Sequence, residues 1–427
     1  LVDGPGGVQV SAELANNDAP QVRGAGSPAV PALSASAPGV DDSGGVAMVR
    51  SIETVVLDAA DEAEAQGTLP PRVVDALWSS GLMQWMNPAV AAGQEPPMSE
   101  MLATWKELAR LDASVGWIGI ANFPSSAFAA SFLPDAGFDE VFVQNDFRVT
   151  LGGQYAPNGV AEACDGGYRL SGEWNFGSGT GHAEYVVGGF IPFRSGEMIV
   201  DDSGMPDLLI AVMPRSDVTF TDNWDVTGLR GTGSYDYNVA DLFVPDHRVY
   251  QLFATEPLRG GPLYSMGILP ITAAGHAAWA LGVARGALDD IVALAGEKTR
   301  MGDETSVAHK LTFQRDLAHH EAMWRAADAA VAAVFADAVK TIEGGGALTQ
   351  MRRADLGLSA TYATECAKEI VHFVHLAAGT TAIRSGSRLE RSFRDIYTGS
   401  QHAFINEKTY TDSAKIMLGL LEDSMSV

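Results

Sequence analysis

Cysteine is scarce in this chain, with Cys164 and Cys366 as its only two among 427 residues. Two thiols so far apart in the sequence do not make a disulfide framework or a cysteine-based metal site. We therefore expect a reducing, cytoplasmic environment and no metal centre. Long apolar runs are missing too, because none approaches the roughly 20 residues of a membrane-spanning helix.

Basic residues are also few. The chain has 28 Lys and Arg against 53 Asp and Glu, which gives a formal net charge of −25. Nucleic acids and anionic membrane surfaces are bound through clustered positive charge, so we expect neither as a partner. The P-loop and the Rossmann glycine fingerprint do not occur in the sequence, and a nicotinamide nucleotide would therefore have to bind to a partner protein.

The sequence pattern divides the chain into four parts. Residues 1–45 are rich in Ala, Gly, Pro, Ser and Val but lack the charged start and apolar block of a signal peptide, and they are predicted to form a flexible arm. Helical periodicity follows over 46–145, short strands with turns over 146–262, and long helices over 263–427. The predicted class is α+β, with a helical N-terminal domain, an antiparallel β barrel or sandwich, and a C-terminal four-helix bundle.

The same patterns place the individual elements. Helices are expected over 99–111, 113–130, 271–295, 307–339, 351–378 and 401–421. Strands are expected over 148–155, 168–176, 184–191, 207–213, 218–224 and 235–244. A Pro-Asn-Gly sequence at 157–159 is expected to form the turn after the first strand.

The most informative segment is the strand 168–176 with the glycine-rich turn behind it. Apolar and polar side chains alternate from Tyr168 to Phe176, which indicates a strand with one buried face. The chain then continues as Gly-Ser-Gly-Thr-Gly over 177–181. Aromatic side chains beside a small hydroxyl and unobstructed peptide N–H groups suit a flat, hydrogen-bonding cofactor such as a flavin.

Four sequence blocks carry a resemblance to a known fold. They are 156–159 (APNG) with 167–179 (GYRLSGEWNFGSG), 224–234 (WDVTGLRGTGS) with 244–245 (VP), 282–288 (GVARGAL), and 388–395 (RLERSFRD) with 401–402 (QH). In this order they resemble the acyl-CoA dehydrogenase fold over about 47–427. Within that fold the chain looks most like the group D two-component flavin monooxygenases, which include p-hydroxyphenylacetate hydroxylase oxygenases, secosteroid hydroxylases and indole oxygenases.

The resemblance implies a flavin-dependent monooxygenase, the oxygenase component of a two-component system. In that group a separate NAD(P)H-dependent flavin reductase supplies reduced flavin, as FADH2 or FMNH2, and O2 adds at flavin C4a. The resulting C4a-hydroperoxyflavin hydroxylates an aromatic or heteroaromatic small molecule of the phenol or indole type. The resemblance also implies a homotetramer.

The resemblance further implies roles for single residues. Ser178 is expected near flavin N5, and His402 is expected to act as the substrate base, because an imidazole titrates near neutral pH. The other residues expected around the flavin are Trp174, Phe176, Gly177, Gly179, Arg230 and Thr232. Ordinary structural roles remain open at these positions, namely a turn serine, a core tryptophan, a capping or interface histidine and a tight turn at 230–234.

Two positions bear on the substrate. Phenol-hydroxylating relatives often carry a His where this chain has Asn122, and an Arg after a Pro-Leu-Tyr segment where this chain has Ser265. Both residues are expected to line the substrate site. Because this chain lacks both polar groups, a larger or neutral heteroaromatic substrate, such as an indole, is expected as much as a phenolate.

Other functions stay open. An acyl-CoA dehydrogenase with bound FAD would often carry a carboxylate base shortly after the Arg394-Asp395 pair, whereas 396–402 contains no acid. An N-oxygenase of the nitrososynthase type and a non-enzymatic binding protein that keeps the fold are further alternatives. Arg391, Arg394 and Asp395 are interpreted as a structural set of ion pairs.

Overall fold

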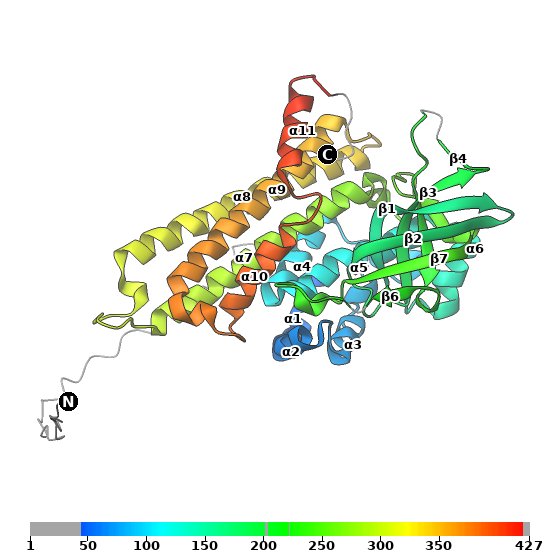
Figure 1. Cartoon of the computed structure of the whole chain (residues 1–427). Coiled ribbons are helices and arrows are strands. Elements are labelled where there is room, and N and C mark those ends of the chain that lie inside the picture. Colours follow the sequence, from blue (N-terminus) through cyan, green and yellow to red (C-terminus); the bar gives the residue numbers. More distant parts are fainter. Residues whose placement is uncertain (1–43, 201–203, 222, 422–427) are drawn as a thin grey trace, which may run out of the picture.

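The computed structural model describes residues 44–200, 204–221 and 223–421, and its elements follow the predicted order of helices, sheet and helical bundle (Figure 1). The arm predicted for 1–45 falls on residues outside the described ones, except for Gly44 and Gly45. These two glycines begin the first helix, α1 (Gly44–Ser51). The carboxylate of Glu100 accepts a hydrogen bond from Gly45 N at 2.7 Å, which fixes the start of this helix.

The other N-terminal helices are α2 (Glu53–Gln66), α3 (Pro71–Ser79), α4 (Met98–Leu111), α5 (Ala113–Phe132) and α6 (Asp135–Val141). Asp112 separates α4 from α5 and caps α5, because its carboxylate accepts hydrogen bonds from Ser114 N at 2.9 Å and Val115 N at 3.0 Å. Almost every residue of α5 is buried. Such a helix must pack on several sides at once, and α5 contacts α4, α7 and strand β1.

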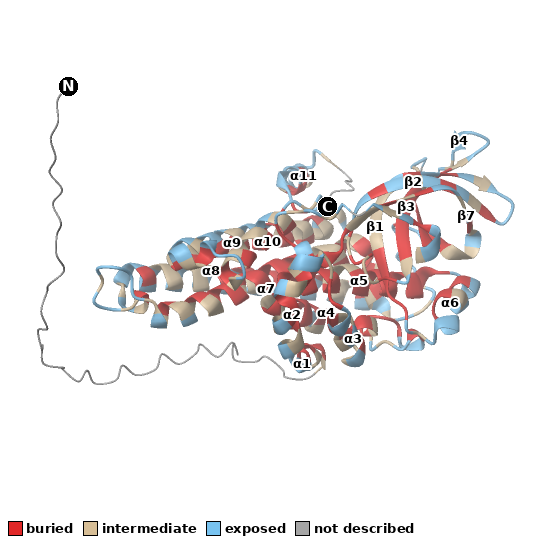
Figure 2. Ribbon diagram, turned by 60° about the horizontal axis from the view of Figure 1, so that its bottom comes forward, coloured by how far each residue is buried: buried red, intermediate tan, exposed pale blue. Residues whose placement is uncertain are grey.

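The C-terminal helices are α7 (Ile268–Glu297), α8 (Leu311–Glu343), α9 (Gln350–Ala378), α10 (Arg388–Gly399) and α11 (Glu407–Met417). The long helix α7 packs along α4 and α9, so it joins the two helical parts of the molecule. Buried residues are concentrated in α4, α5, α7 and the sheet strands next to them (Figure 2). Within the described residues, no helix has both the length and the apolarity needed to span a membrane.

The end of the chain differs from the predicted single helix over 401–421. The structure has α10, then a loop over 400–406, then α11. The side chain of Asn406 accepts a hydrogen bond from Lys408 N at 2.7 Å and caps α11, so this helix begins only after Asn406. His402 therefore lies in a loop between two helices and not inside a helix.

The strands are β1 (Leu151–Cys164), β2 (Gly167–Gly177), β3 (Tyr185–Arg194), β4 (Glu197–Met198), β5 (Leu209–Pro214), β6 (Thr219–Thr221), β7 (Tyr235–Pro245) and β8 (Val249–Gln251). They form one sheet in the order β6-β7-β2-β1-β3-β5-β8, with β4 paired to β3. The expected turn at 157–159 is instead an irregularity within β1, where its register against β3 shifts between Gln154 and Gly159.

The sheet is mixed and not wholly antiparallel. β1 and β2 form an antiparallel hairpin, and the chain then crosses to the other edge of β1 and forms β3 there. Since β2 reverses the chain once and the segment 178–184 reverses it again, β3 runs parallel to β1. This crossing segment contains Ser178, so the connection that makes the sheet mixed also carries the central candidate residue.

Helix α10 ties the sheet to the N-terminal helices. Arg391 and Arg394 both pair with Glu64 of α2, at 3.3 Å and 2.7 Å, as expected for structural ion pairs. Asp395 behaves differently, because its carboxyl accepts a hydrogen bond from Leu229 N at 2.6 Å and is 1% exposed. Leu229 has φ of 56°, and this contact holds the turn before β7 in its left-handed conformation.

We predict that Asp395→Asn flattens the pH dependence of stability. Burial, with a smaller contribution from the Asp112 carboxyl, raises the pKa of Asp395 from 3.8 to about 7. In the unfolded chain the Asp395 carboxyl ionises near pH ~4, whereas in the folded protein it stays protonated until about pH 7. The free energy of unfolding therefore falls as the pH rises from about 4 to 7, by an amount on the order of 4 kcal/mol. Asparagine retains an acceptor for Leu229 N without this charge. Urea unfolding across that pH range measures the difference.

The matched control for this prediction is Asp139→Asn, which changes an exposed carboxylate in α6 in the same way. We expect its stability to follow the wild-type curve. A wild-type-like slope in Asp395→Asn would contradict the raised pKa of Asp395.

Candidate active site

Ser178 lies directly after β2, where three segments of the chain meet. Its Oγ accepts a hydrogen bond from Trp117 Nε1 of α5 at 2.9 Å and another from Ser234 Oγ, just before β7, at 3.0 Å. A serine hydroxyl carries one hydrogen and two lone pairs. Because both neighbours donate to Ser178, its own hydrogen remains available for a further acceptor. The Ser178 side chain therefore bonds to other segments of the chain and not, as in an ordinary turn serine, to its own backbone.

Ser234 is held in turn by Thr232. The two hydroxyl oxygens are 2.7 Å apart, and because Ser234 gives its single hydrogen to Ser178, Thr232 is the donor between them, with Leu229 O a competing acceptor 2.9 Å from the Thr232 hydroxyl. Both side chains are buried. Thr232, expected to contact a cofactor directly, thus has its side chain turned into the protein, where it supports Ser234. Arg230, which belongs to the same 3-10 turn (Arg230–Thr232), is exposed.

An aromatic cluster surrounds Trp117 on the side of the helical bundle. Its ring meets Trp279 edge-on with centroids 4.9 Å apart, His276 at 5.1 Å and His402 at 6.0 Å. The imidazoles of His276 and His402 are only 4.1 Å apart. Trp279 and His276 come from α7 and His402 from the loop after α10, so the packing of α5, α7 and α10 assembles this cluster.

The environment of His402 makes it a weaker base than the sequence suggested. Desolvation lowers the pKa of His402 from 6.5 to about 4, because aromatic rings replace water around the imidazole. At neutral pH the ring is uncharged. Its Nδ1 accepts a hydrogen bond from Phe404 N at 3.4 Å. His276 lies deeper, and burial together with the nearby His402 holds its pKa well below the usual value.

The two aromatic residues at the end of β2 point in different directions. Trp174 is fully buried, stacks on Tyr237 at 5.2 Å and donates to Gly189 O at 3.0 Å. It offers no surface to a cofactor in this conformation and is a core side chain. Phe176 is 63% exposed, because its φ of 59° and the register shift between Trp174 and Gly177 turn it out of the strand's alternation.

Asn122 supports the turn after Ser178 and does not face an open surface. It is fully buried, and its Nδ2 lies 3.4 Å from Gly179 O and 3.5 Å from Thr150 Oγ1. Gly179 needs its missing side chain here, since an added Cβ would lie 1.8 Å from Asn122 Oδ1. Ser265, the other expected substrate residue, is partly buried in a separate 3-10 turn (Pro262–Met266).

The structure thus brings together part of the expected site and adds three residues that sequence reasoning missed. Ser178 and His402 are linked through Trp117, and Thr232 and Gly179 lie behind Ser178. The missed residues are Trp117, Ser234 and His276. Ser234 stood in a quoted block, but Trp117 and His276 lie outside the quoted blocks, in largely apolar stretches of α5 and α7.

These residues fit a flavin. An exposed Phe176 ring, the backbone beside Gly177 and Gly179, and the Ser178 hydroxyl with a hydrogen to donate lie at one strand end. The uncharged cluster around Trp117 adjoins this hydroxyl. A flat heteroaromatic ring with polar edge atoms needs such a combination of aromatic surface and a few placed donors.

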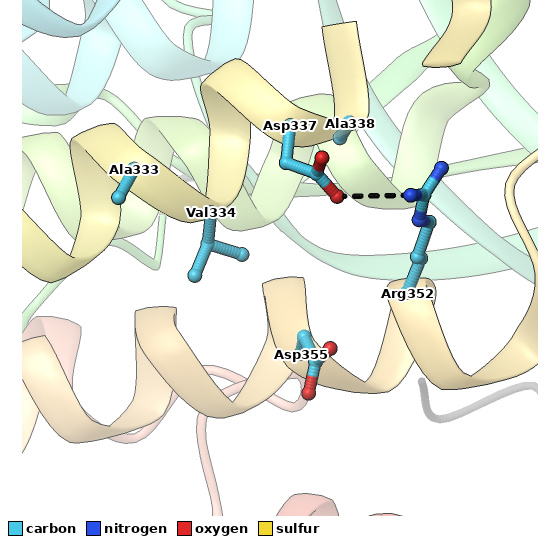
Figure 3. Close-up of a pocket in the computed structure, with 6 residues that line it drawn as sticks. All are labelled: Ala333, Val334, Asp337, Ala338, Arg352 and Asp355. Carbon is cyan, nitrogen blue, oxygen red and sulfur yellow. Dashed lines mark ion pairs between the residues drawn. The ribbon is translucent and has the colours of Figure 1, made fainter. Parts of the chain in front are cut away.

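A separate cavity of about 220 Å³ lies between α8 and α9 (Figure 3). Its walls include Val334 and Asp355, and the ion pair between Asp337 and Arg352 at 3.2 Å borders it. None of its lining residues is among those described above around Ser178 and Trp117, so this cavity is not the candidate active site.

Comparison with known proteins places the chain among relatives of one fold. Residues 274–407 match the family "Acyl-CoA dehydrogenase, C-terminal domain". The chain is 28% identical over 358 residues to the indole-3-acetate monooxygenase of Pseudomonas putida, covering 84% of this chain and 89% of the relative. It is also 28% identical over 362 residues to the flavin-dependent monooxygenase oxygenase subunit HsaA of Rhodococcus jostii, covering 81% and 90%.

A solved structure agrees with these sequence relatives. The structure of XiaF from a Streptomyces species, in complex with FADH2 and glycerol, superimposes with a TM-score of 0.82 at 25% identity and covers 90% of this chain and 97% of that one. The predicted acyl-CoA dehydrogenase-like fold is therefore confirmed, and so is the resemblance to flavin-dependent monooxygenases.

We predict that Gly179→Ala destabilises the protein more than Gly196→Ala, its matched control. The two glycines have nearly the same φ, 75° and 79°, but an added Cβ meets Asn122 only at Gly179, while Gly196 has nothing within 4 Å. The left-handed conformation should cost each variant about 1 kcal/mol. Gly179→Ala should lose a further 1–3 kcal/mol, roughly, because Asn122 must leave its partners. Urea unfolding measures both, and equal losses would contradict the tight turn.

Proposed function

We propose that this protein, an oxidoreductase of the flavin-dependent monooxygenase kind with an acyl-CoA dehydrogenase-like fold, is the oxygenase component that hydroxylates an aromatic or heteroaromatic small molecule. The observation that carries the proposal is the Ser178 hydroxyl. It receives two hydrogen bonds, keeps its own hydrogen and adjoins an uncharged aromatic cluster. Monooxygenase relatives that align over most of the chain support it.

The cofactor in this proposal is a reduced flavin, FADH2 or FMNH2. When bound, it would supply the oxygen chemistry, because a reduced flavin provides the two electrons with which one atom of O2 enters the substrate and the other leaves as water. Phe176 would pack against the flavin ring, and the Ser178 hydroxyl would hydrogen-bond to its N5 edge. Trp117 and Ser234 would keep the Ser178 oxygen at a fixed position, so that its hydrogen points to the cofactor.

The aromatic cluster has two tasks in this proposal. Trp117, Trp279 and the two imidazoles exclude water from the reacting atoms, and this slows unproductive release of hydrogen peroxide. The uncharged His402 orients the substrate through a hydrogen bond, because its lowered pKa makes it a poor acceptor of a full proton at neutral pH. This revises the role of a general base that the sequence suggested.

A separate flavin reductase is the partner in this proposal. The sequence lacks the usual nucleotide-binding fingerprints, so oxidised flavin would be reduced elsewhere by NAD(P)H. A cytoplasmic location belongs to the same proposal. An acyl-CoA dehydrogenase remains the alternative, but the described side chains that contact Ser178 and His402 are indole, hydroxyl and aromatic groups, whereas thioester chemistry would require a carboxylate.

Homotetrameric assembly is also proposed. Exposed apolar side chains along the C-terminal helices and their connection support it, and these are Tyr362, Leu376, Ile383 and Tyr397. Light scattering in solution should give about four times the mass of one chain. A monomer at micromolar concentration would contradict this assembly.

Rapid mixing tests the proposed reaction. The protein is combined anaerobically with FMNH2 or FADH2 and then mixed with O2, with and without phenols and indoles. We expect flavin reoxidation to be slower than in free solution and an aromatic partner to yield hydroxylated product. Reoxidation at the rate of free flavin would contradict an oxygenase. Bleaching of oxidised flavin by an acyl-CoA in the absence of O2 would indicate a dehydrogenase instead.

We predict that Ser178→Ala uncouples the reaction, raising hydrogen peroxide release several-fold at the expense of product. The variant removes the hydrogen bond at the flavin edge but leaves Phe176 and the glycine backbone in place, so flavin affinity should change less than coupling. The matched control is Ser171→Ala, an exposed serine of the same strand. Unchanged coupling in Ser178→Ala would remove this residue from the proposed role.

A further inference from the structure

His276 is a buried imidazole to which the described residues offer no hydrogen-bond partner. It is 5% exposed and lies in α7, packed edge-on against Trp117 and beside His402. No hydrogen bond joins its ring nitrogens to any of the described residues. Polar groups inside a protein normally have a hydrogen-bond partner, so an unused ring nitrogen next to a binding site is placed to receive one from a ligand.

The neighbouring His402 has a different hydrogen-bonding state. Its Nδ1 accepts a hydrogen from Phe404 N, and therefore carries none of its own. A neutral imidazole has one ring hydrogen, which in His402 must be on Nε2. His402 thus presents a donor to any ligand at Nε2. It cannot accept a hydrogen bond there without giving up its contact with Phe404 N.

The two imidazoles are therefore not equivalent. Both stay uncharged, because aromatic rings surround them and a charge on one opposes a charge on the other at a centroid separation of 4.1 Å. A neutral His276 always keeps one ring nitrogen with a free lone pair. Of the pair, only His276 offers an acceptor that no described group already uses.

We propose that His276 accepts a hydrogen bond from the N–H or O–H group of the aromatic substrate, and so selects substrates that carry one. This inference rests on the proposed function of the same site. His402 supplies the complementary donor. The residue acts as an acceptor from α7, outside the block 282–288 by which the sequence of this helix drew attention.

Pairs of probes that differ only in this hydrogen test the inference. Indole is compared with 1-methylindole, and phenol with anisole, by equilibrium dialysis against the flavin-free protein and by product yield with FADH2 and O2. We expect the wild type to bind the N–H or O–H member about tenfold more tightly or better. His276→Leu should reduce this ratio to about one, whereas His276→Gln, which keeps an acceptor, should retain most of it.

The controls separate the possible outcomes. His319→Gln changes an exposed histidine of α8 and should leave the ratio unchanged. A wild-type ratio of one, the absence of binding of every probe, or an unchanged ratio in a folded His276→Leu would each overturn the role of His276. Circular dichroism checks that the two His276 variants fold. If neither folds, the ratio of the two probe affinities in the wild type alone decides whether the site selects for an N–H or O–H group. Discrimination without any product would contradict the proposed oxygenase and leave His276 as a binding residue.

Discussion

The pair of hydrogen bonds that Ser178 accepts is the interaction on which the arrangement of the site depends. Trp117 is 61 residues away in the sequence and Ser234 is 56 residues away, yet both donate to the same oxygen. This contact joins α5, the end of β2 and the turn before β7. It also leaves Ser178 with one hydrogen to give, which turns a residue of a glycine-rich turn into a directed donor.

Burial favours the uncharged form of the titratable groups around this centre, and it therefore shifts the pKa of acids and of bases in opposite directions. Surrounding His402 and His276 with aromatic rings favours their neutral forms, while enclosing Asp395 favours its protonated form. The cluster around Trp117 is therefore uncharged, although the chain as a whole has a net charge of −25. Such a dry and uncharged environment suits oxygen transfer from a flavin, in which water and stray protons divert the reaction.

The sheet contributes geometry more than chemistry. Trp174 fits in its core because glycines face it, and an added Cβ at Gly159, Gly172 or Gly188 would lie within 2.9 Å of its ring. The anchored strand can then end abruptly at Gly177 and pass into the segment that carries Ser178. Asp395 of α10 and Asn122 of α5 hold the neighbouring turns, so helices from both halves of the chain set the position of one strand end.

The sequence by itself determined the order of elements and the fold, and it led to Ser178 and His402 as candidates, because periodicity and local motifs are short-range properties. It could not decide that Trp174 points inward and Phe176 outward, since regular alternation puts both on one face and only the positive φ of Phe176 separates them. Nor could it single out Trp117 and His276, whose helices indicate burial but not neighbours. Their meeting depends on the packing of α5, α7 and α10, which is a property of the tertiary structure alone.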